Sequence, residues 1–222
     1  MNSTNKTTGK NKGKLPPNVF LALFIVITIS MFGISGFFIT KWENKGVEVA
    51  TVGDVKVHSN YYSFYIRETK KSMEQENSLN TPKEKNTFWS SNSNIESARD
   101  TTSKKLQRYV YLTEKADEEN IKITIEQKKS LDDEYNEKYA EYRGDVEDKF
   151  YIANFGMKND AYKKVMESLY IIDNYKEIVM EKENISKEIF EDNISKEINS
   201  NSYKINLFDN ISNKLEPDWQ NN

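Results

Sequence analysis

Few side chains in this 222-residue sequence are of the types that carry catalysis. The chain has no cysteine and a single histidine, His58, which stands just before an expected helix start at Ser59. A general base or a metal site needs partners, and neither cysteines nor paired acids lie near this histidine. His58 is therefore interpreted as a turn residue, and we expect neither a metal nor a cofactor.

The acidic pairs Asp132-Asp133 and Glu118-Glu119 are the other candidates for acid–base chemistry. Both pairs lie in charge-rich stretches with helical spacing, where carboxylates ordinarily face solvent. The sequence also has no G-x-S-x-G motif and no glycine-rich phosphate loop before a helix. These observations favour a protein that is not an enzyme.

Aromatic side chains could instead bind another polypeptide, since they bury its apolar segments without any chemistry. Six of them stand in two short stretches and are predicted to bind client polypeptides: Tyr61, Tyr62, Phe64, Tyr65, Phe88 and Trp89. The alternative for each residue is a place in the protein's own core. On a surface they would line a groove that is wet when empty and dry when occupied.

The location of such a surface depends on an uninterrupted apolar run, Val19 to Thr40. The run contains no charged residue, and as a helix it would reach about 33 Å, enough to cross a membrane. Four lysines and no acid precede it, so residues 1–18 are predicted to be a disordered cytoplasmic tail and residues 41–222 to be extracytoplasmic. A cleaved signal peptide is the alternative, although its apolar core is usually shorter.

The part of the chain after this run is acidic. It carries 28 Lys and Arg residues against 35 Asp and Glu, a net charge of −7. Nucleic-acid binding needs clustered cations, so we expect no nucleic-acid partner. The negative charge would instead attract basic client polypeptides. Separately, the absence of cysteine excludes disulfide bonds. The composition does not indicate an oligomeric state.

The elements that must position these residues follow from periodicity. Alternating β-branched residues at 47–52 and 55–57, separated by Gly53-Asp54, predict a type II′ β-hairpin. Apolar stripes and capping residues then predict a bundle of about five helices, which makes the fold mainly α. The helices are expected to start at residue 60 and to cover 95–120, 124–143, 146–154 and 159–183.

Two stretches lack this periodicity. Residues 74–94 are predicted to be a flexible connection in which Phe88 and Trp89 form the single apolar island. Residues 200–222 are predicted to be a polar tail with one extended segment at 203–208. The predicted domain therefore covers residues 47–199.

The order of several pieces resembles the N-terminal chaperone domain of the SurA/PrsA family of extracytoplasmic foldases, especially its membrane-anchored relatives in Gram-positive bacteria. The pieces are residues 49–57 before a tyrosine-rich helix, Phe88-Trp89 before a long helix, Ala116 to Thr124, and Phe155-Gly156-Met157 with Tyr162. The resemblance implies a hairpin packed on a helical bundle that shelters segments of unfolded secreted proteins.

Family members often continue into a parvulin-type peptidyl-prolyl isomerase domain. Here Tyr203 to Phe208 looks like the first strand of such a domain, but no histidine follows and only 14 residues remain. The isomerase activity is therefore not carried over to any residue of this sequence.

We thus expect a membrane-anchored, extracytoplasmic, chaperone-like protein that binds unfolded or partly folded exported polypeptides without catalysis. A non-catalytic scaffold that docks one specific envelope partner is one alternative. The other is the chaperone part of an isomerase whose catalytic domain is missing from this chain.

Overall fold

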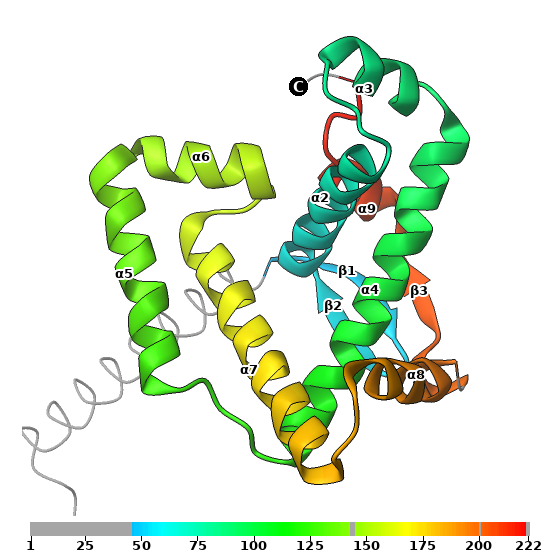
Figure 1. The fold of residues 1–222 in the computed structure, drawn as a ribbon. Coiled ribbons are helices and arrows are strands. Elements are labelled where there is room, and N and C mark those ends of the chain that lie inside the picture. Colours follow the sequence, from blue (N-terminus) through cyan, green and yellow to red (C-terminus); the bar gives the residue numbers. More distant parts are fainter. Residues whose placement is uncertain (1–45, 143–144, 200, 221–222) are drawn as a thin grey trace, which may run out of the picture. The chain divides into compact units, whose positions relative to one another are not determined.

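The computed structural model describes residues 46–142, 145–199 and 201–220. These residues form one compact, mainly helical unit with a small three-stranded sheet (Figure 1). The predicted tail at residues 1–18 and the predicted membrane span at 19–40 lie outside the described residues. Within the described part, no helix combines the length and apolar character that a membrane crossing needs.

The predicted hairpin is present as β1 (Glu48–Val52) and β2 (Val55–His58), which pair antiparallel. Gly53 opens the turn with φ +56°, whereas Asp54 is not among the residues with positive φ. This combination is that of a type II′ turn, in which only the first central residue has a positive φ. The hairpin prediction is confirmed.

A third strand, β3 (Ile205–Leu207), pairs antiparallel with β1, and the strand order is β2-β1-β3. The extended segment predicted near the C-terminus is therefore a strand, but the prediction of a separate tail after residue 199 is wrong. Helix α9 (Asp209–Leu215) follows the strand, and Trp219 packs against the main core. The tail has few apolar residues, and they meet their partners only across a long sequence separation.

Three long helices form the centre of the unit: α2 (Ser59–Glu76), α4 (Asn92–Glu118) and α7 (Asn159–Glu183). They contact one another, and α2 and α4 also contact the hairpin (Figure 1). Asn120 and Asn184 follow α4 and α7 in the left-handed conformation that ends many helices. The predicted apolar stripes supply the core, which includes Tyr62, Ile66, Leu106, Leu112, Ala116 and Ile172.

The connection predicted at residues 74–94 is mostly helical, which corrects the prediction. Helix α3 (Pro82–Trp89) occupies its centre. Thr81 and Glu84 form a reciprocal capping box, and Pro82 stands in the first turn with its φ already set for a helix. A helix this short shows too few apolar positions for its period to be recognised.

The remaining helices are α5 (Ile125–Tyr142), α6 (Asp145–Phe155), α8 (Lys187–Ile198) and the 3-10 turn η1 (Asn201–Tyr203). The predicted capping box at the start of α5 is confirmed, since Thr124 and Gln127 exchange hydrogen bonds of 2.9 and 3.1 Å. Helices α5 and α6 contact each other and α7, and α6 also contacts α2. The described residues thus contain eight α-helices, α2 to α9, rather than about five.

Candidate functional site

The structure divides the six aromatic residues predicted to bind clients between core and surface. Tyr62, Phe64 and Trp89 are buried, whereas Tyr61, Tyr65 and Phe88 are half-buried. Tyr61 stacks on Tyr109 with ring centroids 4.4 Å apart, and its hydroxyl lies 3.0 Å from Ser168 Oγ. These contacts belong to the interior of the bundle. Of the six, only Phe64 lines an open cleft between α2, α6 and α7, which is described below by its walls.

Trp89 is fixed by a buried carboxylate on α2. Its indole Nε1 donates a hydrogen bond of 2.9 Å to Glu74, whose other oxygen lies 2.9 Å from Lys85 Nζ. Lys70 Nζ lies 3.6 Å from the same carboxylate. Burial raises the pKa of Glu74, but the hydrogen bonds from Lys85 and Trp89 and the lysine charges lower it further, so the net pKa lies below its usual value. Glu74 therefore fastens α3 to α2.

A second buried carboxylate fixes the C-terminal segment. Glu216 accepts two hydrogen bonds from Arg99, of 2.8 and 2.9 Å, in a bidentate ion pair. Tyr62 Oη and Trp219 Nε1 donate to the same group at 3.2 and 3.0 Å. Burial, together with the Glu216 charge, raises the pKa of Tyr62 well above its usual value. Residues 209–219 are thereby held against α2 and α4.

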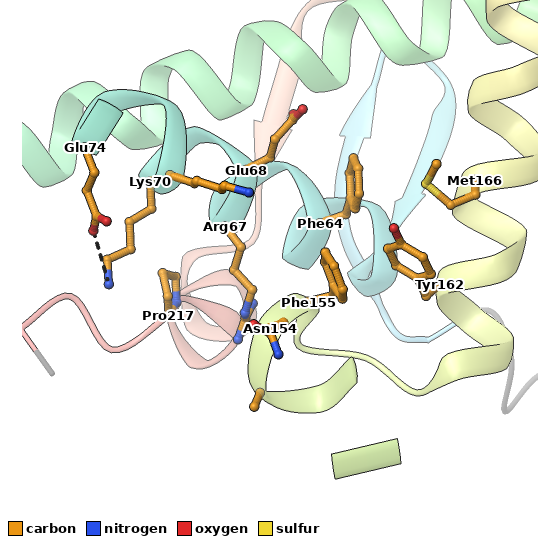
Figure 2. Close-up of a pocket in the computed structure, with 12 residues that line it drawn as sticks. Phe64, Arg67, Glu68, Lys70, Glu74, Asn154, Phe155, Tyr162, Met166 and Pro217 are labelled. Carbon is orange, nitrogen blue, oxygen red and sulfur yellow. Dashed lines mark ion pairs between the residues drawn. The ribbon is translucent and has the colours of Figure 1, made fainter. Parts of the chain in front are cut away.

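An open cleft of about 530 Å³ lies between α2, α6 and the first turns of α7, with Pro217 at its margin (Figure 2). One wall is aromatic and thioether in character. The Tyr162 ring lies 4.3 Å from the Phe155 ring and 6.4 Å from the Phe64 ring, measured between centroids, and Met166 stands one helical turn further along α7. Phe155, Tyr162 and Met166 are half-buried, so these apolar faces remain accessible.

The other wall of the cleft is charged, and Arg67 is its most buried cation without an acidic partner. Its Nη1 donates to two backbone carbonyls, those of Ser63 at 3.3 Å and Leu215 at 2.9 Å. It forms no ion pair with a carboxylate of the described residues. Burial lowers the pKa of its guanidinium, because desolvation disfavours the charged form.

Gly156 allows the Arg67 guanidinium to approach the end of α6. This glycine has φ +69°, and a Cβ built on it would lie 2.4 Å from Arg67 Cζ. A residue with a side chain would therefore meet backbone strain here, and its Cβ would displace the flexible end of the Arg67 side chain. The Phe155-Gly156-Met157 stretch, which the sequence analysis named only within the family resemblance, places an aromatic ring beside the Arg67 cation in the cleft (Figure 2).

The acids that line the cleft already have basic partners. Glu74 is held as described above, and Glu68 forms an ion pair of 3.1 Å with Lys105 of α4. Lys71, which is exposed on the rim, has no ion pair with a described residue. The cleft thus combines an apolar wall with cations that lack acidic partners.

A metal site needs several His, Cys, Asp or Glu side chains that converge on one point. Among the described residues, no three His, Cys, Asp or Glu side chains are placed so that they could hold a metal ion. His58 lies at the end of β2, at the N-terminal cap of α2, and its buried Nδ1 has no hydrogen-bond partner. His58 is thus the last residue of β2, directly before α2, which corrects its interpretation as a turn residue.

Sequence reasoning missed most of the cleft. It named Phe64, but it did not assign Arg67, Met166 or Phe155 to a binding surface, and it mentioned Tyr162 only within the family resemblance. No local signal could have joined the two walls, because Phe64 and Arg67 lie about 90 to 100 positions from Phe155, Tyr162 and Met166. Comparison with known proteins adds no candidate, since no protein-family model, curated protein or solved structure matches the chain.

Proposed function

We propose that this protein is a membrane-anchored, extracytoplasmic, chaperone-like protein that holds unfolded or partly folded exported polypeptides without catalysis. The cleft between α2, α6 and α7 carries the proposal, because it keeps Phe155, Tyr162 and Met166 half-exposed within about 530 Å³. Membrane anchoring rests on the apolar run at residues 19–40 and its basic flank.

The chemistry of the apolar wall suits loose holding of clients whose apolar side chains differ in shape. Aromatic rings present large faces, and the Tyr162 hydroxyl can stay hydrated when the cleft is empty. Met166 has a flexible, polarisable side chain that adapts to differently shaped partners. Few interactions of fixed geometry are then required of the client, which is appropriate for unfolded chains.

A matched pair of double variants tests the holding activity of the full chain in lipid nanodiscs. The cleft variant is Phe155→Ser with Met166→Ser. The control is Ile152→Ser with Ile178→Ser, which removes apolar side chains that are 48% and 44% exposed from the same two helices. Light scattering would follow the aggregation of a model protein diluted from guanidinium chloride, and circular dichroism would check the fold of each variant.

We expect the unmodified chain and the control to slow aggregation and the cleft variant to lose most of this effect. Equal activity of the two variants would contradict the assignment to the cleft, and no effect of the unmodified chain would contradict holding. Photo-crosslinking from position 162 in cells gives a second readout. Many client bands are expected, whereas one stoichiometric product would favour a scaffold that docks a single envelope partner.

The absence of cysteine provides a clean test of location. A single cysteine at the exposed position Lys129 should react with a membrane-impermeant maleimide in intact spheroplasts. A cysteine at position Lys10 should react only after lysis. The opposite pattern would place the folded unit in the cytoplasm and contradict the proposed location.

A further inference from the structure

The charged wall of the cleft indicates which client segments the cleft would bind best. Arg67 is a half-buried cation. It donates hydrogen bonds to two backbone carbonyls and has no carboxylate partner among the described residues. A cation withdrawn from water without a counter-ion is costly, and an acidic group that enters the cleft would offset that cost. The empty cleft is thus complementary to a negative charge.

The described acids that line the cleft do not fill this role. Glu68 is paired with Lys105, and Glu74 is held by Lys85 and Trp89. The local charge therefore differs in sign from that of the acidic chain as a whole. An acidic segment, rather than a basic one, is attracted to the cleft itself.

The spacing of side chains on α2 sets how far the cations lie from Phe64, whose ring centroid is 6.4 Å from that of Tyr162 in the apolar wall. Phe64, Arg67 and Lys71 follow one another at i, i+3 and i+7, so they share one face of the helix. At a rise of about 1.5 Å per residue, Arg67 lies about 4.5 Å and Lys71 about 10.5 Å along the axis from Phe64. An extended peptide covers these distances in about one to three residues.

We propose that the cleft selects client segments in which a Glu or Asp side chain lies one to three residues from an aromatic or large aliphatic side chain. The apolar side chain packs on Phe155, Tyr162 and Met166, and the carboxylate pairs with Arg67 and Lys71. This selectivity rests on the proposed holding function and names the class of polypeptide that it favours.

Two labelled nine-residue peptides test the selectivity on the full chain in nanodiscs. Both contain one Phe and one Leu, and between them stands a Glu in one peptide and a Gln in the other. Acetylated and amidated ends make the side chain the only carboxylate. A third peptide has the Gln and a free C-terminal carboxylate, so it distinguishes a chain end from a side chain. Fluorescence anisotropy at low and high salt would measure the dissociation constants.

We expect the Glu peptide to bind about tenfold more tightly than the Gln peptide at low salt, as one charge-assisted hydrogen bond would produce. Lys71→Glu and Arg67→Gln should reduce this ratio to about twofold or less. The control Lys129→Glu changes an exposed lysine on α5 that does not line the cleft, and it should leave the ratio unchanged. Lys71 is exposed, so its variant remains informative if Arg67→Gln fails to fold.

Each other outcome overturns the selectivity. If the Glu and Gln peptides bind equally and Phe155→Ser with Met166→Ser abolishes both, the holding function stands and the acidic preference fails. If neither peptide binds, the holding function fails as well. Tightest binding of the peptide with the free C-terminus would identify a chain end as the occupant. A dimer in mass photometry that Lys71→Glu dissociates would identify a second copy of this chain.

Discussion

The two sides of α2 differ in how their charges are matched. Toward α3 and the C-terminal segment, the buried carboxylates Glu74 and Glu216 each accept from a tryptophan indole and pair with cations. Toward α6 and α7, Arg67 has no carboxylate partner in the described part of the chain; it donates to the backbone carbonyls of Ser63 and, in the C-terminal segment, Leu215, and the adjoining aromatic rings are half-exposed. On the first side the charges are paired within the protein, whereas on the second side a binding partner could still supply an opposite charge.

This difference separates two roles for the same residue types. Trp89 and Tyr62 were predicted to bind clients, but their rings are fully buried and their polar atoms are satisfied inside the fold. Tyr162 and Phe155 have similar chemistry, yet they stand where the fold leaves their faces open. Substitutions on the matched side should therefore affect stability, and substitutions on the cleft side should affect binding.

The largest effect is expected for Trp89→Ala. This change removes a fully buried ring whose centroid lies 4.8 Å from that of the Trp219 ring. It also leaves the Glu74 carboxylate without its indole donor. We expect the free energy of unfolding to fall by about 3–5 kcal/mol, as for other buried tryptophans. Urea denaturation would measure it. The neighbouring Phe88→Ala is the control, because its half-buried ring should cost clearly less; equal losses would mean that Trp89 is not a core residue.

Glu216→Gln should have the next largest effect. The amide cannot replace both charged hydrogen bonds to Arg99, and it keeps only part of the acceptor capacity that Tyr62 and Trp219 use. Hydrogen bonds to charged groups suggest a loss of about 2–3 kcal/mol in unfolding free energy. In contrast, Glu48→Gln disrupts an exposed pair with Lys56 and should cost less than about 1 kcal/mol. A loss no larger than this control would show that Glu216 does not fasten the C-terminal segment.

A smaller effect is expected from pH. The pKa of Glu74 is lower in the folded state than its usual 4.5, so the unfolded chain binds this proton more readily. The stability that this group contributes is therefore fully present above pH 4.5 and is lost as the pH falls through the folded-state pKa. Because a single proton is involved, the free energy of unfolding can change by at most about 1.4 kcal/mol per pH unit. Urea unfolding at pH 6 and 3.5 should show a smaller pH dependence for Glu74→Gln than for the unmodified chain, and parallel behaviour would contradict the pairing.

The smallest effect on stability is expected for Lys71→Glu on the cleft side. This exposed lysine has no ion pair to lose among the described residues, so the unfolding free energy should change by less than about 0.5 kcal/mol. The same variant is the one expected to lose selectivity for acidic peptides. A large loss of stability would contradict the expectation that substitutions on the cleft side of α2 affect binding rather than stability.

Sequence reasoning predicted the elements that depend on local patterns. The hairpin was visible because Gly53-Asp54 interrupts alternating valines, and α4, α5 and α7 were visible because their stripes and caps repeat over many residues. Helix α3 was missed because its eight residues contain one buried side chain, Trp89. Strand β3 was recognised as extended, but its pairing with β1 spans more than 150 positions.

The order of residues by itself therefore determined the long helices and the hairpin, since their periodic patterns and caps depend on neighbours within a few turns of chain. The acidic balance and the apolar run at 19–40 follow directly from composition. Only the tertiary structure decided which aromatic rings are core and which are cleft. It also decided that Glu68 and Glu74 have basic partners, while Arg67 and Lys71 have no acidic partner within the part of the chain that the structure describes. Burial and charge pairing are properties of side chains brought together from distant positions, and no local pattern specifies them.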